Sequence, residues 1–164
     1  MSAAVRFSPI ARGFTLIELV ITVAIIAVLA SVALPLNELM VTRAKEQDLR
    51  RALRDLRDGI DAYKQAWDDG RITKSPNETG YPKNLDDLVR GIDDQKSPKR
   101  DKIYFMRRIP RDPFATSETL SNAETWGKRA YQSPPDDPKE GEDVFDVFTL
   151  ATGTGINGRP YREW

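Results

Sequence analysis

The sequence predicts an α+β protein in which a long N-terminal α-helix packs on a small antiparallel β-sheet head. An apolar run comes first, an amphipathic stretch with helical spacing follows it, and two short alternating stretches lie near the C-terminus. The chain divides accordingly into four predicted parts. These are a leader at residues 1–13, a hydrophobic helix at 14–35, an amphipathic helix at 36–68, and a globular head at 69–164 with a short helix and a small sheet.

The composition narrows the classes of function. The chain has no His and no Cys, which excludes Ser-His-Asp and Cys-His nucleophile systems and zinc sites built on imidazole or thiolate. Its 25 basic and 25 acidic residues give no overall attraction to nucleic acid. Carboxylate pairs at 68–69 and 136–137 leave a membrane-anchored acid/base enzyme formally open. Adjacent acids in turn-rich loops are usually solvated, so we expect no enzymatic activity.

The apolar run is long enough to cross a membrane. It carries no charge from Leu19 to Leu34, and about 20 helical residues span a bilayer core. Arg6 and Arg12 precede it without any acid, which predicts a cytoplasmic N-terminus and an exported C-terminal part. Pro35 is predicted to bend the helix where it leaves the membrane. An uncleaved signal anchor is the alternative interpretation of this segment.

The segment Arg12–Pro35, RGFTLIELVITVAIIAVLASVALP, resembles the type III signal segment of type IV pilins and of type II secretion pseudopilins. The resemblance implies cleavage after Gly13 by a prepilin peptidase and N-methylation of Phe14. It also implies that Glu18 neutralises the new amino terminus of a neighbouring subunit during assembly. A carboxylate in a membrane helix costs about 3 kcal/mol unless it is paired, which agrees with such a role.

An apolar stripe continues the helix beyond the membrane-length run. Its members recur every three or four residues, which places them on one helical face. They are Leu49, Leu53, Leu56, Ile60, Tyr63 and Trp67. We expect this face to pack on the sheet rather than in a coiled coil, the charged faces to be solvated, and the helix to end between Asp68 and Gly70.

The head is predicted to contain one short helix and two main strands. Residues 70–81 are rich in turn formers and are predicted as a loop. Asn84 is a candidate N-cap for a short helix that Gly91 ends. The strand candidates are Arg129–Ser133 and Val144–Leu150, joined by the polar connection 134–143.

A basic segment at Asp93–Arg111 contains aromatic residues as well as Lys and Arg. No nucleic-acid-binding module surrounds it, so we expect a solvated or filament-contacting surface and no nucleic-acid partner.

The motif IPRDPF, beginning at Ile109, and the WG pair at Trp126 resemble the loop and first strand of the major, G-type pseudopilin head. Residues 115–125 look like a loop insertion between these two motifs.

The G-type resemblance implies a calcium ion in the C-terminal loop. Calcium takes six to eight oxygen ligands, usually with more than one carboxylate. Here residues 151–164 contain no Asp, and their one acid is Glu163. The weak calcium candidates are Asp143, Asp146, Thr152 and Asn157. We expect no cofactor, and a loop closed instead by docking of Pro160, Tyr161 and Trp164.

The resemblance implies a structural subunit of a periplasmic pseudopilus that drives protein export by a type II secretion system. The implied partners are identical subunits, minor pseudopilins, an inner-membrane assembly platform and the prepilin peptidase/methyltransferase. The protein would be a single-pass inner-membrane protein with a periplasmic C-terminal domain before it enters the filament. The alternative is a type IV pilin of a surface fibre for adhesion, motility or DNA uptake, whose C-terminal loop two cysteines often close; this chain has none.

Overall fold

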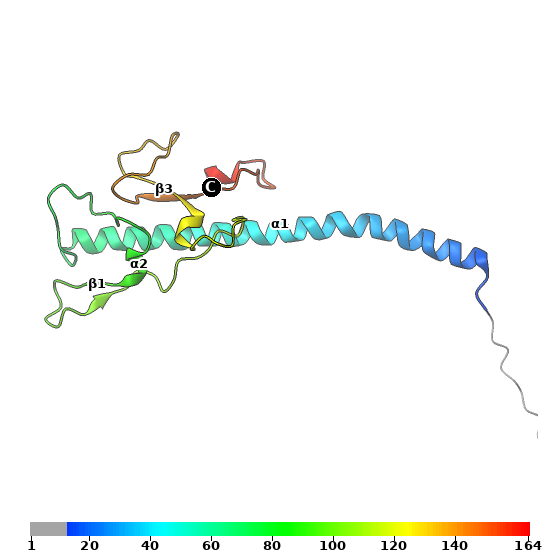
Figure 1. The fold of residues 1–164 in the computed structure, drawn as a ribbon, viewed down its shortest axis with the longest axis horizontal. Coiled ribbons are helices and arrows are strands. Elements are labelled where there is room, and N and C mark those ends of the chain that lie inside the picture. Colours follow the sequence, from blue (N-terminus) through cyan, green and yellow to red (C-terminus); the bar gives the residue numbers. More distant parts are fainter. Residues whose placement is uncertain (1–12) are drawn as a thin grey trace, which may run out of the picture. The chain divides into compact units, whose positions relative to one another are not determined.

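The computed structural model describes residues 13–164, except for the side chains of residues 32–35 (Figure 1). The chain forms two compact units, residues 1–41 and 42–164, which are described separately below. Apart from Gly13, the predicted leader lies outside the described residues.

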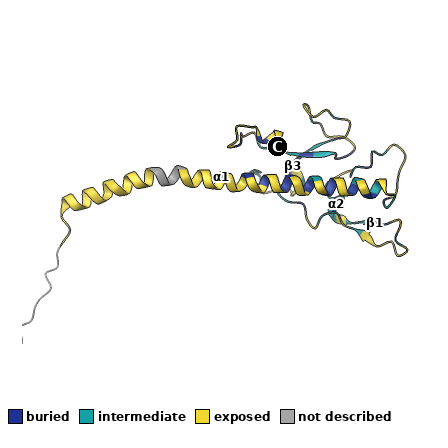
Figure 2. Cartoon of the chain, turned by 180° about the vertical axis from the view of Figure 1, so that it is seen from behind, coloured by how far each residue is buried: buried dark blue, intermediate teal, exposed yellow. Residues whose placement is uncertain are grey.

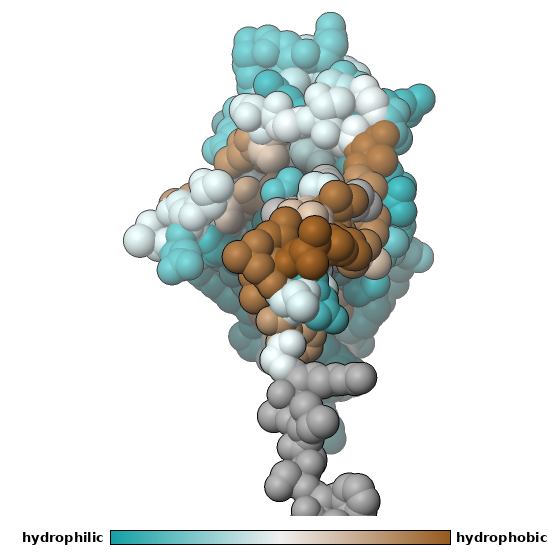
Figure 3. All heavy atoms as spheres, turned by 90° about the vertical axis from the view of Figure 1, so that its right-hand side faces the viewer, coloured by the Kyte–Doolittle hydropathy of each residue, from teal (hydrophilic) through white to brown (hydrophobic). Residues whose placement is uncertain are grey.

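The first unit is dominated by the start of helix α1, Leu16–Asp68. In the described part of the chain, α1 is the one helix long and apolar enough to cross a membrane. Its side chains are exposed over residues 16–31, as Figure 2 shows, and Figure 3 shows the hydrophobic surface that they form. The α1 backbone continues through Pro35, whose side chain lies outside the described residues, so the bend there stays a prediction.

The second unit is built around the C-terminal part of α1. The predicted stripe is confirmed, because Leu49, Leu56 and Ile60 are no more than 1% exposed. Small residues between these positions, such as Ala52, allow the loops and strands of the head to approach the helix. The helix ends at Asp68, as predicted, and Gly70 follows with a φ of 71°.

The short helix α2, Asp87–Arg90, begins later than its predicted N-cap. The Asp87 amide donates to the side chain of Asn84 (3.1 Å), and the Asn84 amide donates to that of Asp87 (3.2 Å). Asn84 therefore caps the turn that leads into α2. Gly91 ends the helix with a φ of 77°, a conformation that favours glycine.

A first antiparallel pair of strands, β1 (Ile92–Asp93) and β2 (Lys102–Ile103), follows α2. The sequence does not predict this pair, because two-residue strands leave no alternating pattern. The sheet of the head is thus two separate two-stranded sheets.

The second sheet pairs β3, Trp126–Arg129, with β4, Asp146–Thr149. The prediction for β4 is confirmed within Val144–Leu150, and its Val147 and Thr149 side chains are buried. The predicted strand Arg129–Ser133 is wrong beyond its first residue. The chain turns after Arg129, where the amide of Ser133 donates to the carbonyl of Ala130, and the true strand begins at Trp126.

Trp126 and Gly127 fix the start of β3. The Trp126 indole is buried and donates to the Pro110 carbonyl at 2.8 Å, which ties the IPRDPF turn to the strand. A Cβ atom at Gly127 would overlap the Phe148 ring, so only glycine fits there without a shift.

The segment 115–125 between the two motifs ends in the 3-10 turn η1, Ala123–Thr125. The Arg111 guanidinium anchors the segment by donating to the carbonyls of Ser117 and Leu120.

Candidate functional site

The residues predicted to be cleaved and methylated are accessible in the N-terminal segment. Gly13, Phe14 and Thr15 are non-helical and exposed, and α1 begins only at Leu16. The Phe14 side chain is 81% exposed, and among the described residues no atom beyond the chain neighbours of Gly13 lies within 4 Å of a Cβ built on it. A peptidase that binds extended chain would therefore meet no packed side chain from residues 15–164 beside Gly13.

Glu18 lies in the first turn of α1 and helps to cap the helix. Its amide donates to the Thr15 hydroxyl oxygen at 3.3 Å, and its carboxylate accepts a long hydrogen bond from the Thr15 amide at 3.5 Å. This reciprocal pattern is a capping box. The predictions from sequence do not include this capping box, although the Thr-x-x-Glu spacing before an apolar run indicates it. The helix therefore holds the Glu18 carboxylate near its own start.

The surface of α1 around Glu18 is apolar and exposed to solvent. Leu16 and Ile17 are 82% and 68% exposed, and large apolar side chains stay exposed along the helix through Leu29. Contiguous exposed apolar surface of this kind marks a contact with lipid or with other protein. Since apolar side chains lie on every side of the helix, it suits a bilayer and equally the core of a helical assembly.

The C-terminal loop is bound to helix α1 by the buried residue Glu46. It is 6% exposed, and its carboxylate accepts from the Ile156 amide at 2.7 Å and from the Tyr161 hydroxyl at 3.1 Å. Burial raises the pKa of Tyr161, with a further contribution from the Glu46 carboxylate. Glu46 is one of the charged helix residues predicted to be solvated, and for Glu46 this prediction is wrong, because the C-terminal loop covers it.

Aromatic packing completes the docking of the loop. Tyr161, in the 3-10 turn η2 (Tyr161–Glu163), stacks on Phe114 at 4.4 Å and meets the Trp164 ring edge-on at 5.1 Å. The Arg50 guanidinium lies 4.2 Å from the centre of the Trp164 ring. The predicted docking is therefore confirmed for Tyr161 and Trp164. It is wrong for Pro160, whose side chain is exposed.

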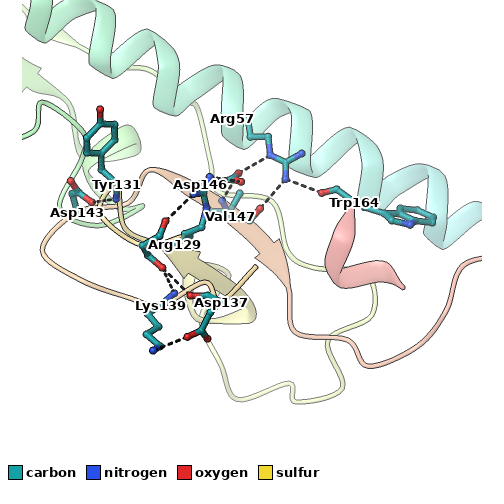
Figure 4. Close-up of polar contacts among 10 residues, drawn as sticks. Arg57, Arg129, Tyr131, Asp137, Lys139, Asp143, Asp146, Val147 and Trp164 are labelled. Atoms are coloured by element: carbon teal, nitrogen blue, oxygen red, sulfur yellow. Dashed lines mark hydrogen bonds and ion pairs between the residues drawn. The ribbon is translucent and has the colours of Figure 1, made fainter. Parts of the chain in front are cut away.

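Arg57 of α1 donates hydrogen bonds to three oxygens of the C-terminal region (Figure 4). Its guanidinium donates to the Asp146 carboxylate at 2.8 Å, to the Val147 carbonyl at 3.2 Å and to the main-chain oxygen of Trp164 at 2.9 Å. A second cation, Arg129, lies 3.6 Å from the other Asp146 oxygen. One guanidinium thus links the helix, β4 and the chain beyond β4.

The calcium candidates do not form a donor set that fits the ion. Asp146 already faces two arginines, and Asp143 accepts from the Thr79 hydroxyl and, at 2.9 Å, from the Tyr131 amide. Thr152 is exposed, and the Asn157 side chain accepts from the Arg159 amide within its own turn. Across residues 13–164, no group of three or more acidic side chains is placed to hold a metal.

The two adjacent carboxylate pairs considered as an acid/base site include residues in surface ion pairs. Asp68 pairs with Lys64 one helical turn earlier, and Asp137 pairs with Lys139 at 2.7 Å. These are ordinary contacts of a solvated surface.

Comparison with known proteins places the chain among bacterial filament subunits. Residues 10–34 match the prokaryotic N-terminal methylation motif. The chain is 28% identical over 155 residues to type II secretion system core protein G of Dickeya chrysanthemi, covering 90% of this chain and 92% of that one. It is 34% identical over 121 residues to the core protein G of Pectobacterium carotovorum subsp. carotovorum, covering 71% and 70%.

A third relative is a pilin. The chain is 38% identical over 76 residues to the type IV major pilin protein PilA of Myxococcus xanthus, but this match covers 46% of the chain and only 34% of the pilin. No solved structure gave a significant match.

Proposed function

The chain belongs to the family of type II secretion system core protein G, and from that premise we propose that it polymerises into a periplasmic pseudopilus that drives protein export. It is a type IV pilin-like pseudopilin of the major kind. Its work in this proposal is mechanical, since subunits added at the base of a filament push its tip outward.

One observation carries the proposal. The first turns of α1 are apolar and exposed, and Glu18 is the single charged residue among residues 13–31. A helix of this kind is stable in a bilayer and, once removed from it, needs the same helices of other subunits as its surroundings. Subunits would then reside in the membrane until the growing filament incorporates them.

Processing creates the group that Glu18 would recognise. Cleavage after Gly13 frees an amino group on Phe14, and N-methylation keeps it cationic. When a subunit enters the filament, the Glu18 carboxylate pairs with the Phe14 ammonium of its neighbour. An unpaired carboxylate among apolar helices is unfavourable by several kcal/mol, so a correctly processed neighbour is favoured over an unprocessed one.

The partners follow from this mechanism. The inner membrane holds the processed chain as a single-pass protein, with residues after the helix in the periplasm. An assembly platform in that membrane lifts subunits into the filament, minor pseudopilins form its tip, and the prepilin peptidase/methyltransferase acts beforehand. The similarity to core protein G supports these partners.

A type IV pilin of a surface fibre is the less favoured alternative. The pilin match is confined to about a third of that protein, whereas the match to one core protein G extends over nearly all of it. The extent of the two matches therefore favours secretion.

We propose further that the subunit is structural rather than catalytic and that its C-terminal loop is closed without calcium. The relatives are a core protein of a secretion system and a major pilin, and neither name describes an enzyme. Glu46, Arg57 and the aromatic residues around Tyr161 already close the loop.

Deletion of the gene in its native host distinguishes a role in protein secretion from a role in a surface pilus. We expect exported proteins to accumulate in the periplasm and the wild-type gene to restore their release, while adhesion, motility and DNA uptake stay unchanged. Normal protein export together with loss of one of those surface activities would instead establish the pilin.

A further inference from the structure

The head carries a surface of unpaired positive charge. We define the basic segment as residues 96–108, which contain one acid and six basic residues. All six basic side chains are exposed, and none of them forms an ion pair with a carboxylate in the described part of the chain. They are Lys96, Lys99, Arg100, Lys102, Arg107 and Arg108.

An aromatic ring lies within the basic segment. Tyr104 is 62% exposed, and one edge of its ring rests on Gly91, where a Cβ atom would overlap it. The ring is therefore held in place while most of its surface faces outward. Tyrosine beside arginine is a combination enriched in protein interfaces.

The head also carries an excess of negative charge in the connection between β3 and β4. We define the acidic connection as residues 134–143, which contain five acids and one lysine. Asp136, Asp137, Glu140 and Glu142 are exposed, and Glu142 forms no ion pair within residues 13–164.

A groove lies beside the acidic connection. It has a volume of about 840 Å³ between this connection and the loop after α1. Pro76, Tyr81 and Pro134 give it apolar walls. Its lining also contains four acids and two lysines: Glu78, Glu140, Glu142, Asp143, Lys83 and Lys139. The lysines pair with Glu78 and Asp137, so the lining keeps a net negative charge, which suits an aromatic side chain that has cations on either side.

The two surfaces lie on opposite sides of the second unit. In Figure 1 the connection that follows β3 lies on one side of α1, and the β1–β2 hairpin with the basic segment lies on the other; Figure 2 shows the same from behind. The charges of one head therefore do not neutralise each other.

We propose that the basic segment of one subunit docks on the acidic connection of the next, with Tyr104 seated at the groove. The contact joins two different patches, so it is heterologous, and a heterologous contact that does not close into a ring generates an open helical filament. This inference rests on the proposed function and adds to it a contact between heads, distinct from that of the apolar helices.

Cysteine cross-linking in the full-length chain tests the contact, because the native sequence has no cysteine. A chain with Lys99→Cys and Glu142→Cys is produced in the native host lacking the wild-type gene and is oxidised in intact cells. We expect a ladder of dimers, trimers and longer species that collapses on reduction. Each single variant should give no more than traces of dimer. The matched pair Lys99→Cys with Glu118→Cys should also give no more than traces, because it keeps one partner and moves the other cysteine to an exposed position outside the contact.

Measuring protein export in the same cells distinguishes failure of the proposed contact between heads from failure of the proposed function. Export without a ladder would overturn the contact and leave the proposed function intact. A chain with one cysteine can form a disulfide-linked dimer but no longer species, so strong dimer formation by either single variant would show a symmetric contact and would also overturn the proposal. If cells with the wild-type chain showed neither protein export nor filaments, both proposals would be overturned.

Charge reversal gives a second measurement that does not depend on cysteine. Glu140→Lys with Glu142→Lys places like charges at the contact, and we expect filament yield to fall about tenfold, the effect of about 1.4 kcal/mol. Adding Lys99→Glu and Arg100→Glu to the same chain should restore the yield to within about twofold. A further fall in the quadruple variant would contradict the pairing.

Discussion

The Arg57 guanidinium lies 2.8 Å from the Asp146 carboxylate and is also 2.9 Å from the main-chain oxygen of Trp164. A single helix residue therefore holds both strand β4 and the end of the C-terminal loop. The same guanidinium also donates to the Val147 carbonyl at 3.2 Å, so a carboxylate and two main-chain oxygens surround one cation.

Replacing Arg57 by Met should destabilise the head. The change removes three hydrogen bonds and leaves Asp146 with one cation, Arg129, at 3.6 Å. Hydrogen bonds to charged groups contribute about 1.5–3 kcal/mol, and the partial exposure of this pair places the expected loss near the lower end, at about 2 kcal/mol. Urea unfolding of the detergent-solubilised chain measures it. The exposed Arg54→Met is the matched control, and equal stability of the two variants would show that the contact is not stabilising.

Removal of calcium should leave the stability of the chain unchanged. The two candidate carboxylates already have partners, and the loop itself supplies no Asp. We expect the melting temperature with excess chelator and with millimolar calcium to agree within about 1 °C. Since 1 kcal/mol shifts the melting temperature of a domain of this size by about 4 °C or more, a shift of several degrees would establish a bound ion.

The hairpin that carries the basic segment should loosen in acid. Arg71 donates two hydrogen bonds to Asp94, and this holds the pKa of Asp94 below its ordinary value of about 3.9. A lowered pKa in the folded chain means that the contribution is complete above that value and is lost as the pH falls through the folded pKa.

The comparison with Asp94→Asn isolates this effect, because the variant cannot titrate there. The melting temperature of the wild-type chain should exceed that of the variant at pH 6, and the gap should narrow as the pH falls from about 4 to about 2. A gap that stays constant over this range would show that Asp94 is not the group responsible.

Gly127→Ala should destabilise the second sheet. The new methyl group would overlap the Phe148 ring across the strand pair, and relief requires movement of a ring that packs between β3 and Arg162. Overpacking of this kind costs about 1–3 kcal/mol. Thermal melting checks the loss, and Gly127→Ala combined with Phe148→Leu should recover part of it. A double variant no more stable than Gly127→Ala would exclude the ring as the cause.

The main elements could be predicted because their signals are local. Helical spacing from Leu49 to Trp67 indicated which face of α1 is buried, and the order Gly-Phe-Thr-Leu-Ile-Glu indicated the processing segment. Both signals depend on residues within a few turns of one another, which a single sequence contains in full.

The contacts that close the head could not be predicted in the same way. Glu46 and Arg57 lie among many charged helix residues, and their partners are about 90 to 115 positions away. Nothing in the helical pattern separates them from solvated neighbours such as Asp58. The start of β3 was also misplaced, because Trp126 and Gly127 follow a 3-10 turn and show no alternation before the pairing with β4 is known.

The role of Glu18 in subunit uptake is tested most directly by competition within one cell. Wild-type chains and tagged Glu18→Ala chains are produced together, and the ratio of the two is measured by mass spectrometry in the membrane and in isolated filaments. We expect both chains in the membrane, cleaved after Gly13 and methylated at Phe14, and an at least tenfold depletion of the variant in filaments, as about 1.4 kcal/mol or more would produce. Equal ratios in membrane and filament would contradict selection by Glu18.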